Sequence, residues 1–188
     1  MAGLRIIAGE RRGFVLAAPA GTATRPTLSR VRESLFSILG ASVPNARVAD
    51  LYAGAGSLGF EALSRGAACC DFVEKARPAL EALRRNSEKL GFGDRARIHA
   101  GDVLRWLRLP AEADPWDIVL VDPPYGTGAA EACLCALAES LRVAPHTEII
   151  VQCGSREALP EALGPLRNRR TQRYGETAVW FFNFRAER

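Results

Sequence analysis

Apolar runs of six or seven residues alternate with amphipathic segments through the middle of the chain. The apolar runs, which have the length of strands, are residues 47–53, 69–75, 95–100, 116–122 and 147–153. The segments between them repeat apolar side chains at helical spacing, which predicts helices over 57–66, 77–91, 102–108 and 129–141. Repeated strand–helix units predict a parallel sheet with helices on both faces and a ligand site beyond the carboxyl ends of its strands.

The two ends of the chain have different patterns. Residues 5–19 place apolar pieces on either side of a charged centre, which predicts a hairpin, and residues 29–40 have helical spacing. Residues 170–184 predict two strands joined near Gly175. We expect a basic N-terminal extension over residues 1–42 and an α/β domain over residues 43–188. The expected domain is Rossmann-like, with a seven-stranded, mostly parallel sheet and a C-terminal antiparallel hairpin.

The composition is that of an ordinary soluble domain. The 188 residues are 48% hydrophobic and 24% charged, and we find neither an apolar run of membrane-spanning length nor a secretory leader. The five cysteines form no C-x-x-C pair, and there are two histidines. We therefore expect cysteines packed in the core, no metal site and no histidine-based catalytic triad. These features predict a cytoplasmic protein in a reducing compartment.

Arginine is concentrated in two places. Residues 1–32 contain six arginines and one acid, although the net charge of the whole chain is +4, and residues 167–173 contain four more arginines. Solvated surface arginine explains this pattern as well as a phosphate-binding surface does, so charge alone does not decide between them. The candidate RNA-binding residues are Arg5, Arg11, Arg12, Arg25, Arg30, Arg32, Arg169 and Arg170.

The segment DLYAGAGSLG at residues 50–59 has the glycine pattern G-x-G-x-x-G between a predicted strand and a predicted helix. Such a turn lets the backbone approach a ligand, and the helix N-terminus favours a negatively charged group. A pyrophosphate and the carboxylate of a methionine moiety both satisfy these features. Glu74 ends the second strand, where an acid can bind ribose hydroxyls, and Asp102 follows the third, within reach of an adenine edge. Together they predict a nucleoside site.

Asp122, Pro123, Pro124 and Tyr125 end the fourth predicted strand. The prolines alone could simply stop the strand, because proline lacks the N–H that pairing needs, but that role leaves the Asp and the Tyr unexplained. An Asp carboxylate and a Pro carbonyl can accept hydrogen bonds from an exocyclic amine, which frees the nitrogen lone pair. Tyr125 can stack on a base removed from its own stack. The tetrapeptide therefore indicates methylation of a base amine, with these four residues as its catalytic set.

In this order, DLYAGAGSLG, FVEK and DPPY resemble a class I S-adenosylmethionine-dependent methyltransferase that acts on amines. RIIAG at 5–9, RPT at 25–27, RVRES at 30–34 and GFEALSRGA at 59–67 narrow the resemblance to the RsmD family. Members of this family methylate the 2-amino group of a guanine in bacterial 16S ribosomal RNA. The resemblance implies this reaction, with S-adenosylmethionine as the cofactor. It also implies a monomer whose partner is 16S rRNA in the small ribosomal subunit or in an assembly intermediate.

Carried over to this chain, the resemblance implies a role for each motif. Asp122 to Tyr125 would hold the target guanine, Glu74 the ribose, and Asp102 with Val103 the adenine. The glycine turn and Asp50 would surround the methionine end. The full predicted cofactor set is Asp50, Tyr52, Ala53, Gly54, Ala55, Gly56, Glu74, Lys75, Asp102, Val103 and Asp122.

Four other functions account for part of the pattern. A DNA adenine methyltransferase shares the DPPY chemistry but typically has an added DNA-reading domain. A protein-glutamine methyltransferase would carry Asn in place of Asp122. An NAD-dependent dehydrogenase explains the glycines and Glu74 but leaves DPPY unexplained. A catalytically silent RNA-binding module would keep the basic extension and lose the pocket.

Overall fold

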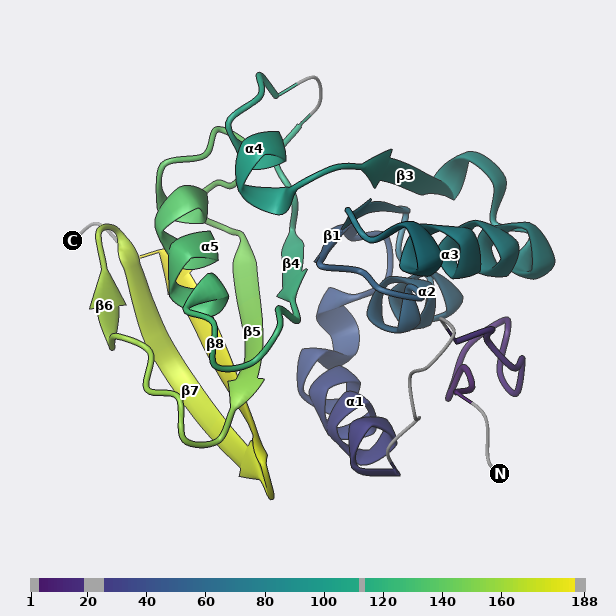
Figure 1. Ribbon diagram of the computed structural model, residues 1–188, viewed down its shortest axis with the longest axis horizontal. Coiled ribbons are helices and arrows are strands. Elements are labelled where there is room, and N and C mark those ends of the chain that lie inside the picture. The colour runs from purple at the N-terminus through teal and green to yellow at the C-terminus, as the bar shows by residue number, and fades with distance from the viewer. Residues whose placement is uncertain (1–3, 19–25, 112–113, 185–188) are drawn as a thin grey trace.

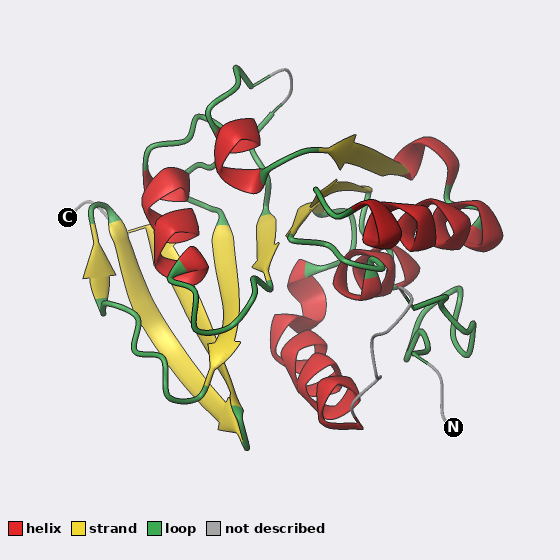
Figure 2. Ribbon diagram, in the orientation of Figure 1, coloured by secondary structure: helices red, strands yellow, loops and turns green. Residues whose placement is uncertain are grey.

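A single eight-stranded sheet runs through the protein in the order β3-β2-β1-β4-β5-β8-β7-β6 (Figures 1 and 2). The computed structural model describes residues 4–18, 26–111 and 114–184. The first five strands are parallel, and β8, β7 and β6 extend the sheet in antiparallel pairs. The strands are β1 (Arg47–Leu51), β2 (Cys69–Glu74), β3 (Ala96–Ala100), β4 (Ile118–Val121), β5 (Glu148–Gly154), β6 (Ala162–Leu163), β7 (Leu166–Tyr174) and β8 (Thr177–Phe184).

Helices cover both faces of this sheet (Figure 1). The α-helices are α1 (Pro26–Leu39), α2 (Ser57–Ser64), α3 (Arg77–Leu90), α4 (Val103–Leu107) and α5 (Ala129–Ala138), and two 3₁₀ turns span Gly40–Ser42 and Gly93–Arg95. The ends of α3 follow from the sequence, because Pro78 suits a first turn and Gly91 adopts the left-handed conformation of a helix C-cap. The predicted α/β class and the alternation of elements are confirmed.

The alternation of side chains along each central strand divides the core in two. On β4, Ile118 and Leu120 pack with α1, α2 and α3, whereas Val119 and Val121 pack with α4 and α5. Both faces of the strand are buried, which is why its sequence is continuously apolar. Strand ends therefore offer the positions where polar side chains can gather, and the ends of β1, β2 and β4 form the site described below.

Two expectations, on the number of strands and on the cysteines, are corrected by the structure, and the N-terminal hairpin is present. The sheet has eight strands rather than seven, because the two-residue β6 pairs with β7 through Ala162 and Leu163. The short N-terminal hairpin pairs through an antiparallel bridge between Arg5 and Val15, with backbone hydrogen bonds from the Ile6 N–H to the Phe14 carbonyl (3.0 Å) and from the Leu16 N–H to the Leu4 carbonyl (2.7 Å). Four of the cysteines are buried, but Cys135 is exposed on α5.

Residues 4–18 lie beside α2 and α3, to which they are hydrogen-bonded (Figure 1). Ile6 and Leu16 belong to the same hydrophobic cluster as Leu35 and Phe36 of α1. This segment shares its core with the α/β domain, and the division at residue 42 stays a prediction. Within the described ranges, no helix is long and apolar enough to cross a membrane, and no group of His, Cys, Asp and Glu side chains could hold a metal ion.

Candidate active site

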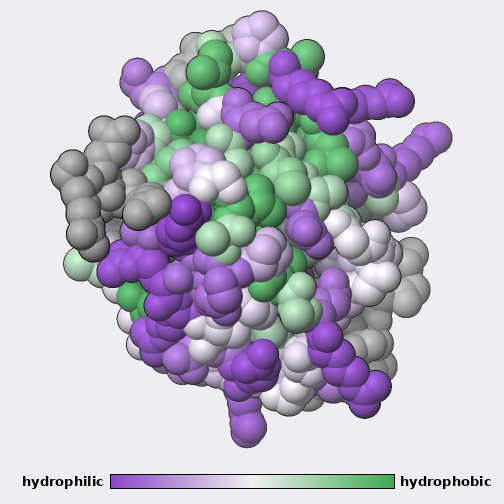
Figure 3. All heavy atoms as spheres, turned by 90° about the vertical axis from the view of Figure 1, so that its left-hand side faces the viewer, coloured by the Kyte–Doolittle hydropathy of each residue, from purple (hydrophilic) through white to green (hydrophobic). Residues whose placement is uncertain are grey.

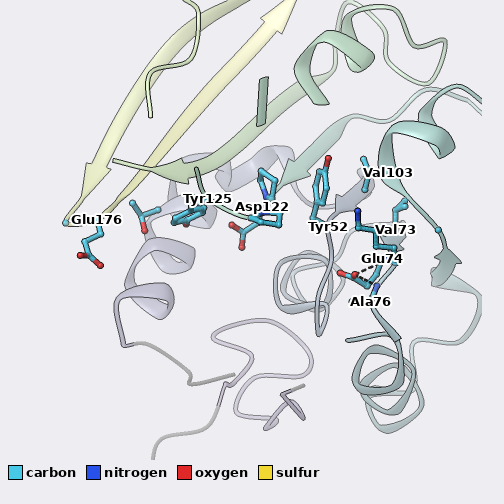
Figure 4. Close-up of a pocket in the computed structure, with 14 residues that line it drawn as sticks. Tyr52, Val73, Glu74, Ala76, Val103, Asp122, Tyr125 and Glu176 are labelled. Carbon is cyan, nitrogen blue, oxygen red and sulfur yellow. Dashed lines mark hydrogen bonds between the residues drawn. The ribbon is translucent and has the colours of Figure 1, made fainter. Parts of the chain in front are cut away.

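A pocket of about 740 Å³ opens at the carboxyl ends of β1, β2 and β4. One end is formed by the strand ends of the predicted nucleoside site, and the other by the DPPY segment and the β7–β8 turn (Figure 4). Its lining residues are Tyr52, Val73, Glu74, Lys75, Ala76, Gly101, Val103, Asp122, Pro123, Pro124, Tyr125, Gly175, Glu176 and Thr177. A volume of this size holds a nucleoside-sized ligand. The two predicted motifs therefore share one cavity.

Asp122 lies in the middle of this pocket, directly after β4 (Figure 4). Its backbone N–H donates to the Leu51 carbonyl (3.3 Å), which fixes the start of the loop to the end of β1. Burial raises the pKa of the Asp122 carboxyl to about 6, against the opposing effect of a hydrogen bond with Gln152. The group is therefore mostly ionised at neutral pH, and can accept a hydrogen bond there.

Tyr125 presents an accessible aromatic ring beside Asp122. The side chain is 40% exposed, and its hydroxyl makes hydrogen bonds with Thr177 and Gln152. Glu157 holds the rest of the loop, because its Oε1 accepts from the Gly126 N–H (2.8 Å) and the Gly154 N–H (2.9 Å). The ring is thus free on one side and anchored at its hydroxyl, as a stacking platform requires.

The raised pKa of Asp122 predicts an acid limb in the reaction. The carboxylate can accept a hydrogen bond only when ionised, so kcat/KM should be level above about pH 7 and fall about tenfold per unit well below pH 6. Initial rates between pH 5 and pH 8.5, measured at constant ionic strength, check this expectation. A flat profile across pH 6 would contradict a role for the Asp122 carboxylate.

The glycine turn after β1 is held from beneath by Asp50. The Asp50 carboxylate is buried and accepts from the Gly59 N–H (2.8 Å), one of the N–H groups that a helix start leaves without a partner. Burial raises the pKa of Asp50 well above its usual range, and nearby Asp122 and Glu74 add to the effect. The structure thus assigns Asp50 to the start of α2 rather than to the lining of the pocket.

The glycines of the turn differ in what surrounds them. A Cβ on Gly54, whose φ is +56°, would meet no atom within 4 Å, so its outer side is open to a ligand. A Cβ on Gly56 would lie 2.5 Å from Leu83 Cδ1, and one on Gly59 would lie 2.3 Å from Phe72 Cε1. Only Gly54 therefore has the open approach that a cofactor needs. The other two glycines serve the packing of α2.

Gly59→Ala should destabilise the protein by about 1–3 kcal/mol, although alanine is normally the better helix former. The added methyl group would overlap Phe72 and Cys70 Sγ, which are buried under α2. Urea unfolding followed by circular dichroism measures the change. Gly91→Asn is the matched control, since Gly91 is a helix C-cap with open space around it. A Gly59→Ala protein as stable as the wild type would contradict the tight packing of α2 on β2.

Glu74 and Asp102 are already engaged with the backbone. Glu74 Oε2 accepts from the Gly54 N–H (2.8 Å), and its Oε1 accepts from the N–H groups of Lys75 and Ala76. Asp102 Oδ1 accepts from the first turn of α4, and its Oδ2 pairs with Lys75 Nζ (3.1 Å). This network holds the Glu74 carboxylate at the pocket wall and keeps Asp102 just outside it.

Tyr52 has a backbone conformation that few non-glycine residues adopt. Its φ is +62°, in the left-handed region, between Leu51 at the end of β1 and the glycine turn. The ring lies between Asp122 and Val103 in the pocket (Figure 4). Strain of this kind is concentrated at functional sites, where the surrounding structure maintains it. The conformation therefore supports a functional placement of the Tyr52 ring.

The structure brings together only part of the predicted cofactor set. The predicted residues that line the pocket are Tyr52, Glu74, Lys75, Val103 and Asp122. The predicted residues that are not part of its lining are Asp50, Ala53, Gly54, Ala55, Gly56 and Asp102. All four residues of the predicted catalytic set, Asp122, Pro123, Pro124 and Tyr125, line the pocket.

The predicted RNA-binding arginines differ in how exposed their side chains are. The exposed ones are Arg5, Arg12, Arg30, Arg169 and Arg170. The face that carries β6 and β7 is rich in hydrophilic side chains around a hydrophobic centre (Figure 3). Arg25 lies outside the described residues.

Two of the predicted arginines have structural partners. Arg11 is partly buried, with its Nε donating to the Leu90 carbonyl (2.7 Å) and its guanidinium over the Phe92 ring. Arg32 is 3% exposed, donates to the Arg5 carbonyl, and has its Nε 3.9 Å from Glu61 Oε2. Arg32 is therefore corrected from a surface phosphate contact to a buried partner of α2.

Sequence reasoning missed the residues that β5 and β8 bring to the site. Gln152 and Glu157 hold Asp122, Tyr125 and the following loop, and Thr177 binds the Tyr125 hydroxyl. The sequence carried only a weak signal for Gln152, which is a polar residue inside the apolar run 147–153. Gln152 lies one position beyond Val151, the residue that pairs with the end of β4. The β7–β8 turn carried no chemical motif to indicate that it would wall the pocket.

The family model described as "Conserved hypothetical protein 95" matches residues 4–183. The chain belongs to this family. Ribosomal RNA small subunit methyltransferase D of Escherichia coli (strain K12) is 36% identical over 157 residues, which cover 84% of this chain and 78% of the relative. The resemblance to the RsmD family is thereby confirmed.

Two further relatives of this RsmD-family chain cover nearly its whole length. YlbH of Bacillus subtilis (strain 168), which carries the name of an rRNA methyltransferase, is 34% identical over 183 residues, or 97% of this chain and 100% of the relative. The solved structure of yhhF from Escherichia coli superimposes with a TM-score of 0.86 at 31% identity and covers 99% and 100% of the two chains. The likeness therefore includes the N-terminal segment and the β7–β8 hairpin as well as the central sheet.

Proposed function

We propose that this protein transfers the methyl group of S-adenosylmethionine to the exocyclic 2-amino group of a guanine in 16S rRNA. The observation that carries the proposal is the single pocket in which the nucleoside-binding strand ends meet Asp122 and Tyr125. A dehydrogenase would use the nucleoside-binding end of this pocket but would have no use for the end formed by Asp122 and Tyr125. The sequence similarity to a ribosomal RNA small subunit methyltransferase D, over 84% of this chain, supports the proposal.

The residues present fit S-adenosylmethionine. Val73, Val103 and Tyr52 supply apolar walls for an adenosine group, and the Glu74 carboxylate lies at the pocket wall where ribose hydroxyls can donate to it. The open side of Gly54 leaves room for the methionine end. When bound, this cofactor supplies an electrophilic methyl group on a positively charged sulfonium. The carboxylates of Glu74 and Asp122 favour that charge.

The residues of the DPPY loop would prepare the base. The Asp122 carboxylate and the Pro123 carbonyl accept hydrogen bonds from the amine, so that its lone pair points away from both acceptors. Tyr125 stacks on the ring, and the anchors on Gln152, Thr177 and Glu157 keep these groups in place. Asp122, with its pKa near 6, can also take the proton that the methylated amine releases.

The substrate would be RNA within the small ribosomal subunit or an assembly intermediate, met in the cytoplasm by a monomer of this protein. Much of the selectivity would come from the shape of the RNA. The exposed arginines near α1 and on β7 would contact phosphates, which supply affinity without sequence information.

A binding and labelling experiment tests the proposal. Calorimetry should show binding of S-adenosylhomocysteine and no binding of NAD. Labelled S-adenosylmethionine and small-subunit particles that lack the modification should then give label in guanine of 16S rRNA. Binding of NAD alone, or label confined to adenine or to protein, would contradict the proposal. Duplex DNA as the acceptor distinguishes the DNA methyltransferase alternative.

Charge reversal separates RNA contacts from the cofactor site. Arg30→Glu and Arg170→Glu should each weaken RNA binding and lower the slope of its salt dependence by about 1 for each phosphate that the variant no longer neutralises. Both side chains are exposed and lie outside the pocket lining, so affinity for S-adenosylhomocysteine should not change. Arg108→Glu, at the exposed end of α4, is the matched control. RNA binding reduced equally by Arg108→Glu would show a general charge effect instead of a contact surface.

A further inference from the structure

Asn86 joins three separate segments of the protein by one buried side chain. It lies on α3 and is 1% exposed. Its Oδ1 accepts from the Ala17 N–H (2.7 Å), while its Nδ2 donates to the Ala17 carbonyl (3.0 Å) and to the Ala55 carbonyl (2.9 Å). Ala17 belongs to the N-terminal segment and Ala55 to the glycine turn. The amide thus uses both of its N–H donors to connect the turn with the N-terminal segment.

Other hydrogen bonds fasten the N-terminal segment to the helices beneath it. Glu61 accepts from the N–H groups of Ile7 (2.7 Å) and Ala8 (3.0 Å), and Ser64 Oγ accepts from the Arg11 N–H (2.9 Å). Lys89 Nζ donates to the Val15 carbonyl (2.8 Å). These bonds anchor the segment to α2 and α3, whereas the Asn86 amide continues from the segment to the glycine turn.

The position of Asn86 at the turn matters because the Ala55 carbonyl lies between Gly54 and Gly56. The Gly54 N–H is fixed by Glu74 (2.8 Å), and the Gly56 N–H by the Ala53 carbonyl (2.7 Å). The Nδ2 bond to the Ala55 carbonyl holds this same Ala55–Gly56 peptide group from the protein side. Loss of this bond would leave that peptide group with its Gly56 N–H bond and without its carbonyl bond, which would loosen the turn that faces a cofactor.

We propose that Asn86 is a positioning residue that couples the N-terminal segment to the cofactor-binding turn. Cofactor bound at the turn would hold the Ala55 carbonyl in place and so strengthen the Asn86–Ala17 bonds. Ordering of the N-terminal segment, for example by RNA, would favour the cofactor by the same factor, because coupling between two sites is reciprocal. The inference rests on the proposed function, since it takes the turn as part of the cofactor site.

Hydrogen exchange on the wild-type protein tests the coupling without RNA. Saturating S-adenosylhomocysteine should slow exchange of the Ala17 amide, which donates to Asn86, about fivefold to tenfold more than exchange of the Ile7 and Ala8 amides, which donate to Glu61. Global stabilisation by the ligand would slow all three amides equally and would overturn the inference. Absence of S-adenosylhomocysteine binding would instead contradict the proposed function.

Variants provide a second test. Asn86→Ala should weaken S-adenosylhomocysteine binding about fivefold to tenfold and abolish the difference between the Ala17 amide and its controls. Lys89→Ala removes a tether of the same segment without touching the turn, so it should lower the affinity much less than Asn86→Ala does. Affinity unchanged in Asn86→Ala, or lowered equally in Lys89→Ala, would overturn the inference. If Asn86→Ala fails to fold, the wild-type exchange measurement still decides.

Discussion

Asp122→Ala should lower kcat by about 10²- to 10³-fold while leaving the affinity for S-adenosylhomocysteine nearly unchanged. The carboxylate is the acceptor that the pocket offers at its centre, and it is held there by the Leu51 carbonyl through the backbone and by Gln152 through the side chain. Its loss removes a preorganised partner of the amine. The cofactor half of the pocket, around Glu74 and Val103, keeps its walls. Single-turnover rates and calorimetry on the same preparation measure the two effects.

Asp122→Asn is the informative control. It keeps a carbonyl oxygen that can accept from the amine, so it should retain part of the activity and lose the acid limb near pH 6. It should also be more stable than the wild type at pH 8 by roughly 1–3 kcal/mol. The raised pKa means that Asp122 stabilises the fold below pH 3.8 and that this contribution is lost as the pH rises through about 6. Full activity in Asp122→Ala would contradict the role of the carboxylate.

Tyr125→Ala should reduce kcat/KM for RNA about 5- to 150-fold, the equivalent of the ~1–3 kcal/mol that a base gains by stacking on an aromatic ring. The ring is 40% exposed at the pocket, which is the arrangement expected of a platform awaiting a base. Removal of the ring leaves Asp122 and its partner Gln152 in place. The defect should therefore appear as a loss of productive RNA binding, with cofactor affinity unchanged.

Tyr125→Phe separates the ring from its hydroxyl. It keeps the stacking surface and loses the hydrogen bonds to Thr177 and Gln152, so its effect should be smaller, within about tenfold. Steady-state rates with small-subunit particles should decrease in the order wild type, Tyr125→Phe, Tyr125→Ala. Equal defects in the two variants would contradict stacking and would point to the hydroxyl as the important group.

Much of the fold follows from local sequence because its elements carry their own signals. The buried runs of β1, β4 and β5 are apolar on both faces, and α3 has a proline in its first turn and a glycine at its end. β6 has neither signal. Its two residues, Ala162 and Leu163, are a strand only because β7 lies beside them. Whether so short an edge strand forms depends on its pairing partner, which the local sequence does not reveal.

The site could be predicted as far as its residues end strands. Glu74 and Asp122 follow apolar runs, so their convergence is a consequence of parallel strand order. Gln152 and Thr177 could not be predicted in the same way, because they reach Asp122 and Tyr125 only when β5 lies beside β4 and β8 beside β5. The burial of Arg32 could not be predicted for the same reason: its partner Glu61 is on another helix, and local charge cannot show burial.

Nucleoside mass spectrometry of 16S rRNA tests most directly whether one pocket brings a methyl donor and a guanine amine together. The measurement compares cells lacking this gene with the same cells complemented with wild type or Asp122→Ala. We predict that one N2-methylguanosine is absent without the gene, returns with the wild type and does not return with Asp122→Ala. An unchanged set of methylated guanines in the deleted strain, or full restoration by Asp122→Ala, would contradict the claim.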